Sequence, residues 1–444
     1  MQKIGRTDFL AWTTIGVAVV ALLTLLWTDS FVAVPIILGM VAGLAFGMNR
    51  GLPYLLLFAA LSSATGLKYG ALTVGDVLAI AAVAFGLMGR IIHKDGAPIL
   101  WPYVAPALVF LWGAVVAAAH DVPVVPVAIF AGSIVVVIAA FTLPIRTERQ
   151  LELVAAAFVI GACVNSISAV LDYLNVFDVT AFTASDRLND TRPPGLTTHS
   201  NQLALVTYLA LPFAYHLTGR RPIWGVSIAV LAAGAFATGS RGALIGAVIV
   251  TVLYILISGR RVFGKFTIAI LAAIVVILVA TELGLTTGLT RLTGDASADQ
   301  SDVERVRRAQ VALSEFFANP ITGVGFTTGE AHNFYLEVAR SGGLVTLVIM
   351  VVFAATVLIA GWRVRRQVAI AVPALASASI WFIMAFQQNS LNVRFIWVPV
   401  GFVLAAVALS NAISKQPSLD EPVLTTRLTR KHRARGSRVS RPSS

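Results

Sequence analysis

Long apolar runs, repeated from one end of the chain to the other, constrain this sequence more than any other feature. A helix needs about 20 apolar residues to cross the hydrocarbon core of a bilayer, and runs of nearly that length recur through all 444 residues. Only 12% of the residues are charged, whereas a soluble domain carries roughly 25%. The bilayer therefore takes the place of a packed core as the apolar solvent.

We predict an all-α membrane protein, a polytopic bundle of about 12–14 transmembrane helices. Two runs, 53–67 and 223–238, are short, which leaves the number open between these limits. The first run follows Lys3 and Arg6 without a small-residue cleavage site, so we interpret it as a signal anchor. The candidate spans are 9–28, 31–48, 53–67, 74–92, 101–119, 124–143, 151–171, 201–218, 223–238, 241–258, 265–284, 342–362, 368–386 and 394–413.

The net charge of +12 is distributed as in a membrane protein and not as on a nucleic-acid surface. With the N-terminus in the cytoplasm, most Lys and Arg residues fall in inside loops and in the C-terminal tail, as the positive-inside rule expects. We divide the chain into a transmembrane domain at 1–415 and a basic, disordered cytoplasmic tail at 416–444. Membrane lipids are the expected partners of this tail, and no nucleic acid is expected. The single Cys163 excludes a disulfide within the chain.

A large extracytoplasmic loop at 285–333 contains its own predicted amphipathic helix. Ser301 and Glu304 stand at the spacing of a capping box. Apolar residues then recur at intervals of three or four as far as Phe317. Asn319-Pro320 is expected to end this helix, because the residue before a proline avoids the helical conformation.

Arginines that face the outside oppose the charge rule and need a reason. Arg192 precedes Pro-Pro-Gly, Arg241 lies in a Thr-Gly-Ser-Arg-Gly break between two short spans, and Arg305 lies on the amphipathic helix. Guanidinium groups that face one cavity bind a multiply charged anion, because their planar forks hold phosphate oxygens bidentately. The break at Ser240 also lets backbone N–H groups point at the same anion. We therefore predict a site for a lipid diphosphate.

His332 is the candidate catalytic base of the outer loop, because the unperturbed pKa of histidine is about 6.5. Asn333 beside it is expected to bind substrate. Structural interpretations stay open: His332 could cap or pack the next span, Arg241 could be a plain loop residue, and Arg305 could lie on a solvated helix face. Other outward arginines are expected to be solvated or to contact lipid headgroups: Arg307, Arg308 and Arg394.

At these residues the chain resembles the O-antigen ligase and O-antigen polymerase superfamily of bacterial glycan-assembly enzymes. The matching pieces are Thr238–Gly242, a stretch from Arg305 that ends in NPITGVG, and the AHNFYLE segment that contains His332 and precedes Gly342-Gly343. The resemblance covers residues 185–365 and extends over the rest as hydropathy. It implies a membrane-embedded glycosyltransferase of the C type that is inverting, needs no metal and uses no cofactor.

The resemblance also implies the substrates. The donor would be a glycan on undecaprenyl diphosphate, and the acceptor would be a hydroxyl of a glycan, a lipid or a protein. Arg192, Arg241 and Arg305 would hold the diphosphate, and His332 would activate the acceptor. Transfer would take place at the outer face of the bacterial cytoplasmic (inner) membrane, catalysed by a ligase or polymerase of cell-surface polysaccharide.

The main alternative is a secondary transporter or a lipid-linked oligosaccharide flippase, because carriers often have this number of spans. Carriers place polar groups near the membrane midplane in broken helices, whereas the unusual residues of this chain cluster at the outer ends. A structural scaffold is a third interpretation, but it leaves the outward arginines unexplained. No Asp-x-Asp, HExxH or P-loop motif stands where it could serve catalysis, and no metal site is expected.

Overall fold

The computed structural model describes residues 51–69, 72–93, 99–179, 183, 192–259, 296–327, 331–388, 391 and 393–414. The expected spans 9–28, 31–48 and 265–284 lie outside these residues, and so does the C-terminal tail. Within the described ranges the regular structure is helical, except for a hairpin in which β1 (Lys68–Tyr69) pairs antiparallel with β2 (Leu72–Thr73).

The helices confirm the prediction of an all-α polytopic membrane protein. In the described part of the chain, 7 helical segments are long and apolar enough to cross a membrane. They are α4 (Val74–His93), η1 with α5 (Trp101–Tyr103 and Val104–Ala119), α6 (Val125–Thr142), α7 (Glu148–Tyr173), α10 (Arg241–Ser258), α14 (Phe334–Val364), and η7 with α16 (Arg394–Trp397 and Val398–Ser414). The other helices are α3 (Leu52–Leu61), α8 (Ser200–Arg220), η4 with α9 (Pro222–Trp224 and Gly225–Ala237), α13 (Ala296–Ala318), and α15 with η6 (Ala371–Met384 and Ala385–Gln387).

Local sequence explains where several of these helices begin and end. Thr147 and Gln150 form a capping box at the start of α7, because each side chain binds the backbone N–H of the other. The predicted capping box of the outer loop is wrong: α13 already begins at Ala296, so Ser301 lies inside it, and Glu304 binds two arginines instead. The predicted end at Asn319 is confirmed.

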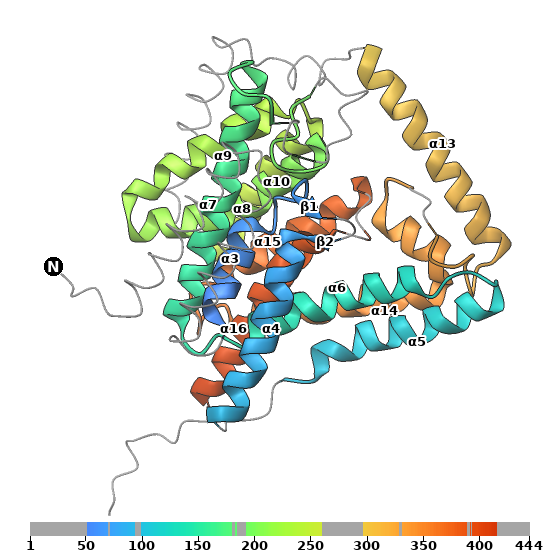
Figure 1. The fold of residues 1–444 in the computed structure, drawn as a ribbon, viewed down its shortest axis with the longest axis horizontal. Coiled ribbons are helices and arrows are strands. Elements are labelled where there is room, and N and C mark those ends of the chain that lie inside the picture. Colours follow the sequence, from blue (N-terminus) through green and yellow to red (C-terminus); the bar gives the residue numbers. More distant parts are fainter. Residues whose placement is uncertain are drawn as a thin grey trace, which may run out of the picture.

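The helices pack on one another (Figure 1), and many aromatic side chains are buried between them. Helix α7 packs on α3, α8 and α9, while α15 packs on α8, α10, α14 and α16. Phe213 and Phe402 meet with ring centroids 4.5 Å apart, and Phe141 and Phe158 pack against Phe402. Contacts between aromatic rings hold together helices that are far apart in the sequence.

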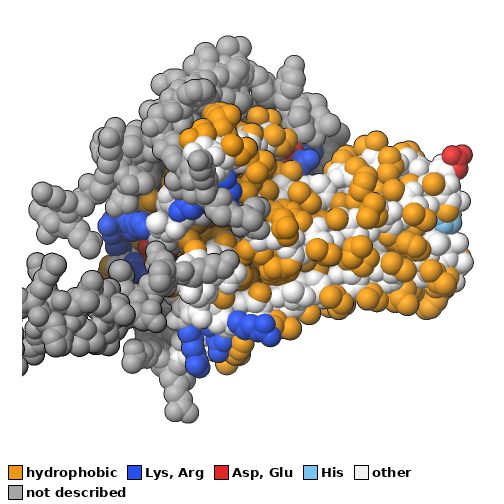
Figure 2. Space-filling model, turned by 90° about the horizontal axis from the view of Figure 1, so that it is seen from below, with side chains coloured by type: hydrophobic (Ala, Val, Ile, Leu, Met, Phe, Trp, Pro, Cys, Tyr) orange, Lys and Arg blue, Asp and Glu red, His pale blue; other side chains and the backbone are white. Residues whose placement is uncertain are grey.

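The surface formed by α5, α6 and α14 is apolar. Helices α5, α6 and α14 lie side by side and extend away from the rest (Figure 1). Hydrophobic side chains cover this region in Figure 2. The large apolar side chains that these helices expose include Leu111 and Val115 of α5 and Val348 and Val352 of α14. Such a surface suits the hydrocarbon of a bilayer.

Helix α14 is interrupted at Gly343, whose backbone lies at φ 67° and ψ −169°. An added Cβ there would come within 1.9 Å of the carbonyl oxygen of Ile321, so only glycine fits. The NPITGVG segment docks against this break: the N–H of Val324 binds the carbonyl of Arg340, and the N–H of Leu344 binds the carbonyl of Pro320. These bonds satisfy backbone groups that the interruption leaves without helical partners.

Candidate active site

Two arginines that lie far apart in the sequence meet at one carboxylate, and a third affects the pKa of one of them. Arg241, the first residue of α10, donates from Nη2 to Oδ1 of Asp302 on α13 at 2.6 Å. Nη1 of Arg305 lies 3.8 Å from the same oxygen. Burial lowers the pKa of Arg305 from its ordinary value, Asp302 opposes that shift, and the positive charges of Arg241 and Arg192 add to it. The structure therefore brings together all three arginines singled out from the sequence.

Asp302 occupies the position that an anion would take between Arg241 and Arg305. The side chains of all three are partly exposed, at 45%, 30% and 36% respectively, so the cluster opens to solvent. A carboxylate presents oxygens to guanidinium groups in the way that a phosphate does. The arginine centre, meaning Arg192, Arg241 and Arg305 with Asp302, is thus built around negative charge.

The start of α10 adds polar groups to the arginine centre. Gly239 takes a left-handed turn at φ 58°, and Ser240 directly precedes the helix. The Ser240 hydroxyl donates to Oδ1 of Asn201 at 3.3 Å. Helix α10 begins at Arg241 without a side-chain capping bond from Ser240, and the first N–H groups of a helix have no partners within the helix.

His332 is held in an unusual backbone conformation, at φ 48°. The residues around it explain how. The N–H of Ala331 donates to the Glu337 carboxylate at 2.9 Å, and Asn333 caps α14 by accepting from the N–H of Leu336 at 3.1 Å. Phe334 is 1% exposed and packs between other aromatic rings. A non-glycine residue with positive φ persists only where its surroundings dictate it, as they do here.

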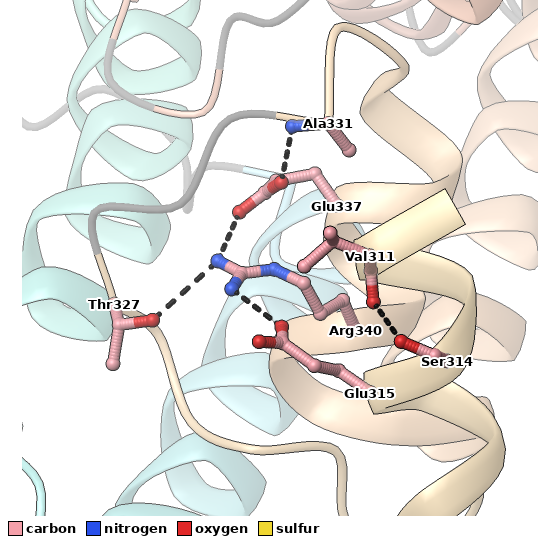
Figure 3. A network of polar contacts seen from close by, with 7 residues as sticks. All are labelled: Val311, Ser314, Glu315, Thr327, Ala331, Glu337 and Arg340. Atoms are coloured by element: carbon pink, nitrogen blue, oxygen red, sulfur yellow. Dashed lines mark hydrogen bonds and ion pairs between the residues drawn. The ribbon is translucent and has the colours of Figure 1, made fainter. Parts of the chain in front are cut away.

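A buried ion-pair network supports this loop (Figure 3). Arg340 donates to Glu337 at 2.6 Å and to Glu315 of α13 at 2.9 Å. It also contacts the hydroxyl of Thr327 at 3.4 Å. The side chains of Arg340 and Glu337 are 7% and 0% exposed. Glu337 and Arg340 together thus join three parts of the molecule: Glu337 binds the segment that leads to His332, and Arg340 links α14 to α13 through Glu315.

The short helix η6 contacts both halves of the site. The hydroxyl of Tyr335 donates to the carbonyl of Phe382 at 2.8 Å, and its ring lies 4.6 Å from that of Phe386. On the other side, a Cβ added to Gly242 would lie 3.8 Å from Oε1 of Gln387. The start of α14, which follows His332, and the start of α10, which carries Arg241, therefore flank the same end of α15.

The structure corrects one expectation and reveals residues that the sequence did not single out. Arg394, expected at lipid headgroups or in solvent, forms an ion pair with Asp76, whose side chain is 3% exposed. Asp302 and Gln387 were not predicted as site residues, because their contacts with the site depend on helices that are distant in the sequence. Among the described residues, no group of His, Cys, Asp and Glu gathers in a way that could hold a metal ion.

The region that contains this geometry has a family signature. Residues 226–351 match the O-antigen ligase family. The match includes Arg241, Arg305 and His332, and it supports assigning the chain to the O-antigen ligase and polymerase superfamily. Among curated proteins, none matches this chain.

The matched region contains Arg241, Arg305 and His332, whereas the loop with Arg192, the start of α8 and η6 lie outside it. It begins in α9, continues through α10 and α13, and ends in α14 after the break at Gly343. A match to this family suggests glycan transfer of the ligase or polymerase type, with a lipid-linked glycan as partner. The multi-pass helical fold agrees with that assignment.

Proposed function

We propose that the protein transfers a glycan from an undecaprenyl-diphosphate-linked donor to an acceptor hydroxyl at the outer face of the bacterial cytoplasmic membrane. The observation that carries the proposal is the arginine centre. In it, Arg241 and Arg305 share the Asp302 carboxylate, and Arg192 lies close enough to lower the pKa of Arg305. A diphosphate offers the same kind of negative charge with more oxygens. Its affinity for forked guanidinium groups is correspondingly high.

In the proposed reaction the acceptor hydroxyl attacks the anomeric carbon of the donor sugar, and the bond from that carbon to the diphosphate breaks. His332 accepts the hydroxyl proton as general base. Arg192, Arg241, Arg305 and the N–H groups at the start of α10 stabilise the negative charge that develops on the leaving undecaprenyl diphosphate. The leaving group is already activated, so anion stabilisation and a base account for the chemistry.

The roles of Ser240 and Asn333 are narrower in this proposal. Ser240 donates its hydroxyl proton to Asn201 and directly precedes α10, so it would fix the start of that helix, and it would have to release Asn201 to donate to the diphosphate. The side-chain oxygen of Asn333 is engaged in capping α14, which leaves its amide NH₂ group to donate to substrate. Both residues would position the substrate and would not take part in proton transfer.

The test is glycan transfer from a lipid-linked donor by purified variants, normalised to folded protein. Arg241→Lys keeps the charge but lacks the bidentate fork, and we expect a rate loss of about 10²–10³-fold, as for one lost donor to a developing anion. His332→Ala should lose about 10²–10⁴-fold, as for a lost general base.

Arg307→Lys is the matched control, because Arg307 lies on α13 near Arg305 but is 64% exposed and, among the described residues, pairs only with Glu304. It should transfer at the rate of the unmodified protein. Full activity of both Arg241→Lys and His332→Ala would refute the proposed site, and a transporter or flippase would then be the better interpretation.

A further inference from the structure

A cavity lined by both apolar and polar side chains lies between α3, α4, the start of α8 and η7. Its volume is about 240 Å³. A single water needs roughly 10–15 Å³ and drug-sized ligands occupy roughly 300–1,000 Å³. The cavity therefore has room for a small polar group such as one sugar ring.

The cavity is lined by both apolar and polar side chains. Phe58 and Phe395, both 1% exposed, belong to the apolar part of the lining. Around them stand the hydroxyls of Thr65 and Thr198, both of which donate to Oε1 of Gln202, at 2.7 and 2.9 Å. Sugars have apolar ring faces and polar edges, and this division of the surface matches them.

Donors with positive charge face the cavity. Asp76 binds Nη1 of Arg394 and the N–H of Thr73, so it orients the guanidinium and neutralises its charge. Lys68, from β1, lines the cavity and makes no ion pair or hydrogen bond with the described residues. The described residues also supply no acceptor for the Nε2 of Gln202. Among the described residues that line the cavity, Lys68 and Arg394 carry positive charge and only Asp76 carries negative charge, so their sum is positive.

One helical turn connects this cavity with the arginine centre. His199 and Gln202 at the start of α8 line the cavity, while Asn201 between them accepts a hydrogen bond from Ser240 beside Arg241. A glycan attached to a diphosphate at the arginine centre would therefore reach the cavity with its nearby sugars.

We propose that this cavity is a sugar-binding subsite for the glycan substrate, and that Lys68 with the guanidinium of Arg394 selects a sugar that carries a carboxylate. The inference rests on the proposed function and adds a substrate class to it: glycans that contain an acidic sugar. Lys68 and the N–H groups of Arg394 that do not bind Asp76 hold the carboxylate. Thr65, Thr198 and Gln202 bind the ring hydroxyls, and Phe58 and Phe395 pack against one face of the ring.

The experiment measures binding of free glucuronate and free glucose to the full-length protein in nanodiscs, by ligand-observed NMR. We expect glucuronate to bind more tightly than glucose. Lys68→Gln should weaken glucuronate binding about 10-fold, the effect of losing one charge-assisted hydrogen bond, and should leave glucose binding unchanged. Arg307→Gln removes one positive charge from the exposed face of α13 and is the matched control.

Equal binding of the two sugars, or equal effects of Lys68→Gln and Arg307→Gln, would overturn the inference. Transfer assays separate it from the proposed function. If Lys68→Gln binds glucuronate normally while Arg241→Lys loses transfer, the subsite fails and the proposed function stands. If glucuronate binding depends on Lys68 while neither Arg241→Lys nor His332→Ala affects transfer, the subsite stands and the proposed function fails.

Discussion

The buried pair of Glu337 and Arg340 offers the sharpest test of how His332 is held. Glu337→Gln keeps the size of the side chain and one oxygen that can still accept from the N–H of Ala331. It removes the negative charge that lies 2.6 Å from Arg340. Arg340 then remains buried, with Glu315 as its only carboxylate partner among the described residues.

The expected magnitude follows from burial. Removing one partner of a buried ion pair costs about 3–5 kcal/mol, because the other charge is left uncompensated. Arg340 keeps Glu315 at 2.9 Å, so we expect the lower end, about 3 kcal/mol for Glu337→Gln. Glu315→Gln should cost less than about 1 kcal/mol, because that carboxylate is 38% exposed and Arg340 keeps Glu337.

The assay is reversible unfolding in mixed detergent micelles. It compares the single variants Glu337→Gln, Glu315→Gln and Arg340→Met with the double variant Glu337→Gln/Arg340→Met. The double variant removes both charges, so it should recover part of the loss. We expect a coupling energy of about 1–3 kcal/mol between the two positions. Glycan transfer by Glu337→Gln should fall as well, because the segment before His332 loses part of its anchor.

A coupling energy below about 0.5 kcal/mol would refute this reasoning, since that is the range in which independent sites add. So would an equal loss of stability in Glu315→Gln and Glu337→Gln, because the argument depends on their different burial. Transfer that stays at the original rate in a destabilised Glu337→Gln would separate the network from His332.

Three further outcomes are expected. Asn333→Ala should destabilise the protein by about 0.5–2 kcal/mol through loss of the cap on α14, measured by the same unfolding assay. The arginines beside Glu304 hold the pKa of that carboxyl at about 2, so its ion pairs should persist as the pH falls below 4.5 and be lost only near pH 2, as followed by carboxyl ¹³C NMR; titration near 4.5 would contradict this. In a Cys163→Ala background, an impermeant thiol reagent should label Val303→Cys but not Arg366→Cys in intact cells, and the reverse would overturn the predicted orientation.

The sequence was sufficient for features that depend on local composition and spacing. Apolar runs locate the membrane helices, because each must bury its own backbone polar groups in lipid; the predicted run 241–258 has the same bounds as α10. Asn319-Pro320 marks the end of α13 because the restriction before proline is local. The charge distribution singled out Arg241 and Arg305 as predicted outward arginines, because insertion opposes outward positive charge, and their orientation stays a prediction.

Other features were decided by tertiary structure alone. Asp302 was assigned to a predicted capping box, but its partner Arg241 comes from another helix at no fixed distance in the sequence. Arg394 was assigned to solvent, and its pairing with Asp76 depends on how η7 approaches α4. The network of Glu315, Glu337 and Arg340 likewise exists only because α13 docks on α14. Local pattern shows which side chains are charged, whereas the packing of helices determines which charges meet, and the chemistry of the site follows from those meetings.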